Sequence, residues 1–131
     1  HPVGHMYRLE GARLHRQLFI NALRKIYPAT RQTLWVEMPS GGRVSLVHQP
    51  DRKRYCAHLL YGPPMPRGIC QIIEDLVPLQ KIPVALRVKE KIRRAILPLS
   101  GRTLRISQKA GTVTLTVPRV QRHEVVVFEY R

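Results

Sequence analysis

The sequence predicts a mainly β protein, an antiparallel β-sandwich of about eight strands with one amphipathic helix at its N-terminus. From residue 33 onward, short apolar segments are separated by turn-forming residues roughly every ten residues, as in sandwiches and barrels. Residues 111–118 alternate threonine with valine or leucine, which is typical of a strand with one buried face. No second helical pattern of useful length follows, so alternating βαβ units are disfavoured.

The helix is expected over residues 9–26. Leu14, Leu18, Ala22 and Ile26 recur at intervals of four residues and would share one helix face. Pro28 would end the helix, because proline lacks the N–H that continues the hydrogen-bond ladder. We therefore expect residues 1–28 to form a helical segment and residues 29–131 to form the sandwich.

The predicted strands lie between turns rich in glycine, proline and charged residues, such as 40–42 and 50–53. Residues 123–130 carry apolar side chains on both faces, with Val126 and Phe128 on one and Val125 and Val127 on the other. This pattern predicts a central strand. The eight or nine expected segments are residues 33–39, 43–49, 54–62, 69–79, 82–90, 93–99, 103–107, 111–118 and 123–130.

Charge is the most unusual feature of the composition. The chain has 23 Lys and Arg against 8 Asp and Glu, a formal net charge of +15. Such a charge suits a polyanionic partner, but the basic residues are spread along the chain without a nucleic-acid-binding signature. Nucleic acid is therefore a disfavoured but open partner. The sequence contains neither a transmembrane segment nor a secretory h-region, so we expect a cytoplasmic protein with no membrane partner.

Glu74 and Asp75 are adjacent and raise the question of a catalytic carboxylate pair. In an extended strand, neighbouring side chains point to opposite faces. The two acids therefore could not flank one substrate bond, as paired carboxylates of glycosidases must. We expect one of them to pair with a nearby arginine or a turn and the other to face solvent, and we predict no catalytic residue in this chain.

Cysteine and histidine chemistry is also disfavoured. Cys56 and Cys70 fit no zinc spacing and are expected to be small apolar core residues, so neither a metal nor a cofactor is predicted. Cys56 and His58 would share one strand face, but no third group that orients them is evident. We expect His58 to be a core or edge residue, and His123 to bond to backbone at the start of the last strand.

Several phrases resemble one family of enzymes. "YRLEGARLHRQLFINAL", "RYCAHLLYGPPMPRG", "IIEDLVPL", "VALRV" and "GTVTLTVPRVQRHEVVVFEY" are similar to the C-terminal part of β-galactosidase-like glycoside hydrolases. The resemblance implies that residues 1–28 are the tail of a preceding flavodoxin-like trimerisation domain and that residues 29–131 are a terminal β-sandwich. It also implies that the catalytic barrel lies outside this chain, which would be a fragment of a longer enzyme.

Three functional hypotheses follow. The first is a non-catalytic accessory domain with a structural or substrate-framing role, whose partners are the parent glycosidase domains or other subunits. The second is a carbohydrate-binding module, for which exposed aromatic side chains would be needed. The candidate contacts are Trp35, Tyr61 and Tyr130, although the apolar neighbours of Trp35 favour its burial. The third is a basic domain that binds nucleic acid or another polyanion.

Overall fold

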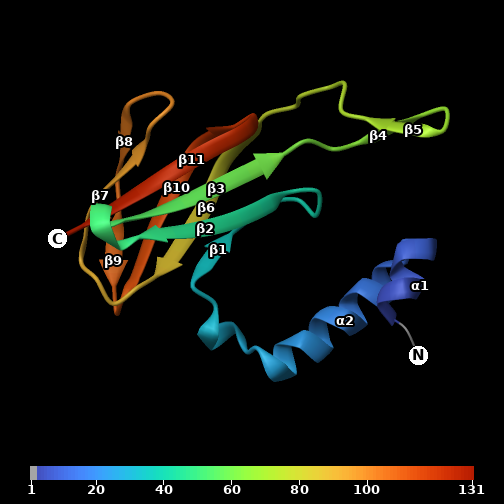
Figure 1. The fold of residues 1–131 in the computed structure, drawn as a ribbon, viewed down its shortest axis with the longest axis horizontal. Helices are drawn as coiled ribbons and strands as arrows, with labels where there is room; N and C mark the ends of the chain where they lie inside the picture. Colours follow the sequence, from blue (N-terminus) through green and yellow to red (C-terminus); the bar gives the residue numbers. More distant parts are fainter. Residues whose placement is uncertain (1–2) are drawn as a thin grey trace. The chain divides into compact units, whose positions relative to one another are not determined.

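The computed structural model describes residues 3–131 and divides the chain into two compact units, one ending at Gln32 and the other running from Thr33 to Arg131 (Figure 1). The first unit contains the helices α1 (Val3–Glu10) and α2 (Arg13–Ile26), followed by the 3-10 turn η1 (Ala29–Arg31). The second unit contains all eleven strands of the described chain, so the predicted mainly β class is confirmed.

The N-terminal helix differs from the prediction at its start. A single helix over residues 9–26 was expected, but Gly11 separates α1 from α2. Gly11 adopts the left-handed conformation with φ of 64° and donates its N–H to the carbonyl of Tyr7 at 2.8 Å, which ends α1. α2 ends at Ile26, two residues before Pro28, as predicted.

Within the helical unit, the apolar stripe of α2 is left uncovered. Leu14 is 81% exposed and Ile26 is 77% exposed, and no residue of α2 is buried. α1 packs against α2 without covering this stripe. An amphipathic helix normally buries its apolar face, so the stripe is a surface suited to contact with another polypeptide.

The strands form two main antiparallel sheets and one separate hairpin (Figure 1). One main sheet has the order β1 (Leu34–Val36), β6 (Leu79–Arg87), β10 (Thr112–Val120), β9 (Ser107–Lys109). The other has the order β2 (Arg43–Gln49), β3 (Arg54–Tyr61), β11 (Arg122–Tyr130), β7 (Ile92–Leu97), β8 (Arg102–Leu104). The hairpin pairs β4 (Met65–Arg67) with β5 (Cys70–Ile72), and the 3-10 turn η2 (Pro50–Arg52) joins β2 to β3.

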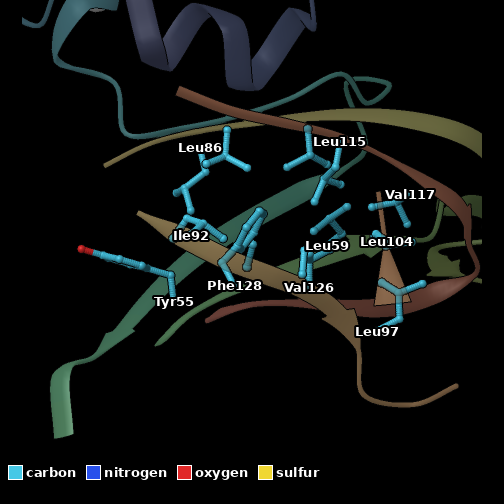
Figure 2. Packing of buried hydrophobic residues seen from close by; sticks show 14 of the residues in the cluster. Tyr55, Leu59, Leu86, Ile92, Leu97, Leu104, Leu115, Val117, Val126 and Phe128 are labelled. Atoms are coloured by element: carbon cyan, nitrogen blue, oxygen red, sulfur yellow. The ribbon is translucent and has the colours of Figure 1, made fainter. Parts of the chain in front are cut away.

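A continuous apolar core lies between the inner faces of the two main sheets (Figure 2). Phe128 on β11 is completely buried, and Val113 and Val117 on β10 contact the same cluster. No polar or charged residue is buried in the part of the chain that the structure describes. The alternation predicted for residues 111–118 is confirmed, and β11 is a central strand between β3 and β7.

Two predicted strands are divided or shortened, and β4 forms at residues 65–67, outside every expected segment. The one division and β4 account for the two strands beyond the nine expected segments. Residues 69–79 were expected as one strand, but β5 ends at Ile72 and β6 begins only at Leu79. Residues 103–107 divide between β8 and β9, which belong to different sheets, with Arg105 and Ile106 as the crossing point. A strand that changes sheets must break its ladder, and the apolar pattern alone does not show where.

Candidate functional site

The adjacent acids Glu74 and Asp75 lie on the exposed segment between β5 and β6, outside any strand. The strand argument against their cooperation therefore does not apply. Instead, Arg67 on β4 donates two hydrogen bonds to Glu74 Oε2, from Nε at 3.0 Å and from an Nη at 2.6 Å. The expected pairing with a local arginine is present, and Asp75 is exposed to solvent.

The cysteines and histidines separate into two environments. Cys56 is buried on β3 with its Sγ 4.0 Å from Gln49 Oε1, whereas Cys70 is exposed, so the expected core position of Cys70 is wrong. The ring of His58 stacks on that of His123 at a centroid distance of 5.3 Å, and their nitrogens share a hydrogen bond of 3.1 Å. The side chain of His123 therefore bonds to another imidazole, where a backbone partner was expected.

Aromatic side chains gather where β2, β3 and β11 pair. The ring of His48 stacks on that of Tyr55 at 4.1 Å, and His48 Nε2 shares a hydrogen bond of 2.8 Å with the Tyr130 hydroxyl. Tyr55 donates its hydroxyl to Glu90 Oε2 at 3.1 Å. Burial, followed by this bond to Glu90, raises the pKa of Tyr55 to about 12. The candidate contact Tyr130 is thus held in a hydrogen-bonded cluster.

A groove of about 930 Å³ runs over the outer face of the four-stranded sheet. Trp35 on β1 stands at one edge and is 50% exposed, so its expected burial in the core is wrong. Cross-strand register aligns Trp35 with Ala85 on β6, Ala85 with Thr114 on β10, and Thr114 with Ser107 on β9. These four residues form one row across the sheet on its solvent side.

A second row lies beside the first. The N–H of Glu37 bonds to the carbonyl of Pro83 at 3.0 Å, and Pro83 is in register with Thr116. Lys81 and Arg105 also line the groove. Lys81 has a φ of 53°, a left-handed conformation that is uncommon for a lysine within a strand. Such backbone outliers gather at functional sites more often than elsewhere in a fold.

The three candidate carbohydrate contacts do not form one site. Trp35 lines the groove, Tyr130 belongs to the cluster with His48 and Tyr55, and Tyr61 lines a smaller pocket with Gly62 and Arg122. Sequence reasoning missed the hydroxyls and the cations of the groove. The alternation of threonines with apolar residues in 111–118 indicated a polar face, but it did not show which strand would lie opposite.

Within residues 3–131, no three His, Cys, Asp or Glu side chains are placed to hold a metal ion together. Neither described helix combines the length and the apolar character that crossing a membrane would require.

Comparison with known proteins identifies a structural similarity. No protein-family model matches the sequence, and no curated protein matches it. Among solved structures, the chain is similar to alpha-L-fucosidase isoenzyme 2 from Paenibacillus thiaminolyticus, with a TM-score of 0.90 and 33% sequence identity. The alignment covers 98% of this chain but only 20% of the fucosidase chain. The fold of this chain is therefore found as a minor part of a glycoside hydrolase, and the β-galactosidase-like part of the expected resemblance stays a prediction.

Proposed function

We propose that this chain is a non-catalytic accessory β-sandwich domain of a glycoside hydrolase, together with the helical end of the domain that precedes it. The observation that carries the proposal is the similarity to the fucosidase, which includes nearly all of this chain and one fifth of that enzyme. Because both units of the chain are included at 33% identity, the similarity is more than a shared sandwich architecture.

Three carboxylates support a non-catalytic role, because each is held by a hydrogen bond or ion pair to a neighbouring side chain. Glu74 is held by Arg67, Glu90 accepts the Tyr55 hydroxyl, and Glu129 accepts hydrogen bonds from Arg93 and Arg94. The two arginines lower the pKa of Glu129, so this carboxyl is suited to an ion pair and poorly suited to proton donation.

The uncovered apolar stripe of α2 supports the presence of further protein. An exposed stripe of leucine, isoleucine and phenylalanine lowers the solubility of a protein, whereas burial of the stripe against a neighbouring domain is energetically favourable. We propose that the remaining part of the parent enzyme covers this stripe. The finer assignments, a C-terminal position, a β-galactosidase-like parent, a role in framing the substrate entrance and a cytoplasmic location, remain predictions.

The test compares the complete parent protein with the isolated 131-residue chain on nitrophenyl α-L-fucoside, β-D-galactoside and α-L-arabinoside. We expect the complete protein to hydrolyse at least one of these substrates and the isolated chain to hydrolyse none. Turnover by the purified chain that is lost in Glu74→Gln but kept in the surface control Asp51→Asn would overturn the proposal. A parent reading frame without a glycosidase domain would overturn it as well.

A further inference from the structure

The groove beside Trp35 has the shape of a binding site for an extended ligand. Ala85 and Pro83 on β6 line it between β1 and β10, and their side chains are shorter than those of Trp35 and Arg105. Trp35 forms one edge, and the segment around Arg105 forms the other. With strands about 4.8 Å apart, the four strands span roughly 14 Å, enough for a chain of several linked rings.

Trp35 supplies an exposed aromatic surface to the groove. Its neighbours Leu34 and Val36 point into the core, so the strand alternation holds the indole outward. Half of the side chain is exposed, although burial of a tryptophan is strongly favourable. An aromatic ring at the edge of a groove matches the C–H face of a sugar ring, which is apolar while the rim of the sugar is rich in hydroxyls.

The floor of the groove supplies hydrogen-bonding groups for such a rim. Ser107, Thr114 and Thr116 all face this side, and each hydroxyl can donate one hydrogen bond and accept others. Thr114 Oγ1 lies 3.3 Å from the carbonyl of Ser107, a weak bond that fixes the hydroxyl direction and leaves its lone pairs to accept. Few polar groups on a mostly apolar lining are the usual composition of a small-molecule site.

The charge of the groove selects among saccharides. Lys81, Arg102 and Arg105 line it, and Glu37 is the acidic residue of the lining. The left-handed backbone at Lys81 changes the direction of this side chain relative to an ordinary strand position. Three cations against one carboxylate favour a ligand that carries negative charge.

We propose that the groove binds a saccharide chain that bears carboxylate or sulfate groups. Trp35 stacks on one sugar ring, the three hydroxyls bond to its rim, and Lys81 and Arg105 pair with the anionic groups. This inference deepens the proposed function, on which it rests for the class of ligand. Single-stranded nucleic acid is a poorer match, because its binding surfaces stack successive bases on several aromatic side chains.

The experiment uses the 131-residue chain and the fluorescence of Trp35, which is its single tryptophan. The probes are oligogalacturonate, a sulfated galactan oligosaccharide and a neutral galactan oligosaccharide of equal length. We expect the first or the second probe to shift the emission and protect Trp35 from acrylamide, with much weaker binding of the neutral probe. The comparison of the two anionic probes distinguishes a carboxylate from a sulfate ligand.

Variants locate the binding by calorimetry. Trp35→Ala should weaken it at least about tenfold, while the exposed control Tyr27→Ala leaves it unchanged. Lys81→Gln and Arg105→Gln should each weaken binding and reduce its salt dependence, in contrast to the control Arg52→Gln. Circular dichroism confirms folding, and Trp35→Phe, which keeps an aromatic ring, should retain part of the affinity.

The inference would be overturned by the absence of saccharide binding by the folded chain, by equal affinity in Trp35→Ala, or by tighter binding of single-stranded DNA than of either anionic saccharide. Protection of Trp35 in the complete protein without ligand would show the groove to be covered by the parent, which also refutes it. If the complete protein hydrolyses a glycoside but the groove binds no saccharide, this inference alone is refuted. If the chain binds a saccharide but the parent protein contains no glycosidase domain, only the proposed function is refuted.

Discussion

At the scale of single residues, Tyr55 connects the aromatic cluster to the core. Its ring is buried and stacked on His48, and its hydroxyl donates to Glu90. Ionisation of Tyr55 would place a phenolate in an apolar environment next to a carboxylate. Desolvation by burial is the largest cause that raises its pKa to about 12, followed by the hydrogen bond to Glu90 and then by the charges of Glu90 and Tyr130.

The raised pKa of Tyr55 predicts a loss of stability at high pH. Between its usual pKa of about 10 and about 12, the unfolded state releases the phenolic proton while the folded state keeps it. The free energy of unfolding is therefore unaffected below pH ~10 and falls as the pH rises toward ~12. Tyr55→Phe should remove this part of the slope, measured by urea unfolding at a series of pH values.

The hydroxyl of Tyr55 also contributes to the stability of the fold at neutral pH. Tyr55→Phe removes the hydrogen bond to Glu90 and should cost about 1 kcal/mol at pH 7. Tyr27→Phe is the control, because the exposed Tyr27 hydroxyl bonds to the carbonyl of Arg31 within the helical unit. If the free energy of unfolding fell equally with pH in the wild type and in Tyr55→Phe, the attribution of this fall to the raised pKa of Tyr55 would be wrong.

At the scale of elements, the hairpin between β9 and β10 depends on its turn residues. Lys109 pairs with Thr112, and the two residues between them, Ala110 and Gly111, have φ of 46° and 75°. Positive φ at both central positions is the requirement of a type I′ turn, which matches the twist of the strands. Gly111 also brings its carbonyl to the N–H of Val88 at 2.9 Å.

Gly111→Ala should therefore destabilise the sandwich by about 1–2 kcal/mol, because an L-residue is disfavoured at this φ. The added Cβ would also lie 3.2 Å from the Val88 carbonyl oxygen. The matched control is Gly41→Ala, where nothing lies within 4 Å of the new Cβ and φ is not positive. Chemical denaturation measures both variants, and an equal effect would contradict the turn argument.

The elements also show what the sequence could predict. The alternation in β10 and the two-sided apolar pattern of β11 are local, and both predictions are confirmed. Trp35 was expected in the core because its neighbours are apolar. However, β1 is an edge strand whose outer face stays open. Because Leu34 and Val36 point inward, strand alternation would have predicted that Trp35 points outward.

The groove itself could not be predicted from local patterns. Its lining comes from segments around residues 35, 83, 105 and 115, which are far apart along the chain. Only the strand order β1-β6-β10-β9 brings Trp35, Ala85, Thr114 and Ser107 into one row. Strand order depends on long-range pairing, and the period of two fixes faces without fixing neighbours. The break of the helix at Gly11 was missed because glycine is tolerated within helical patterns.

At the scale of the whole molecule, the net charge of +15 opposes compact folding. Acidic partners offset it at a few places, such as the bonds from Arg93 and Arg94 to Glu129 and from Arg67 to Glu74. These pairs are exposed, so each contributes little to stability in water. Repulsion among the excess cations is therefore expected to outweigh the attraction within the pairs.

Added salt should consequently stabilise the sandwich. Raising NaCl from ~20 to ~500 mM shortens the screening length from roughly 20 Å to a few ångströms and weakens the long-range repulsion first. We expect Tm, followed by Trp35 fluorescence, to rise by several degrees. The double variant Arg52→Gln and Lys109→Gln, which lowers the charge outside the described ion pairs, should show a smaller rise. A fall in Tm with salt would instead mean that the pairs with Glu129 and Glu74 dominate the electrostatics of this fold.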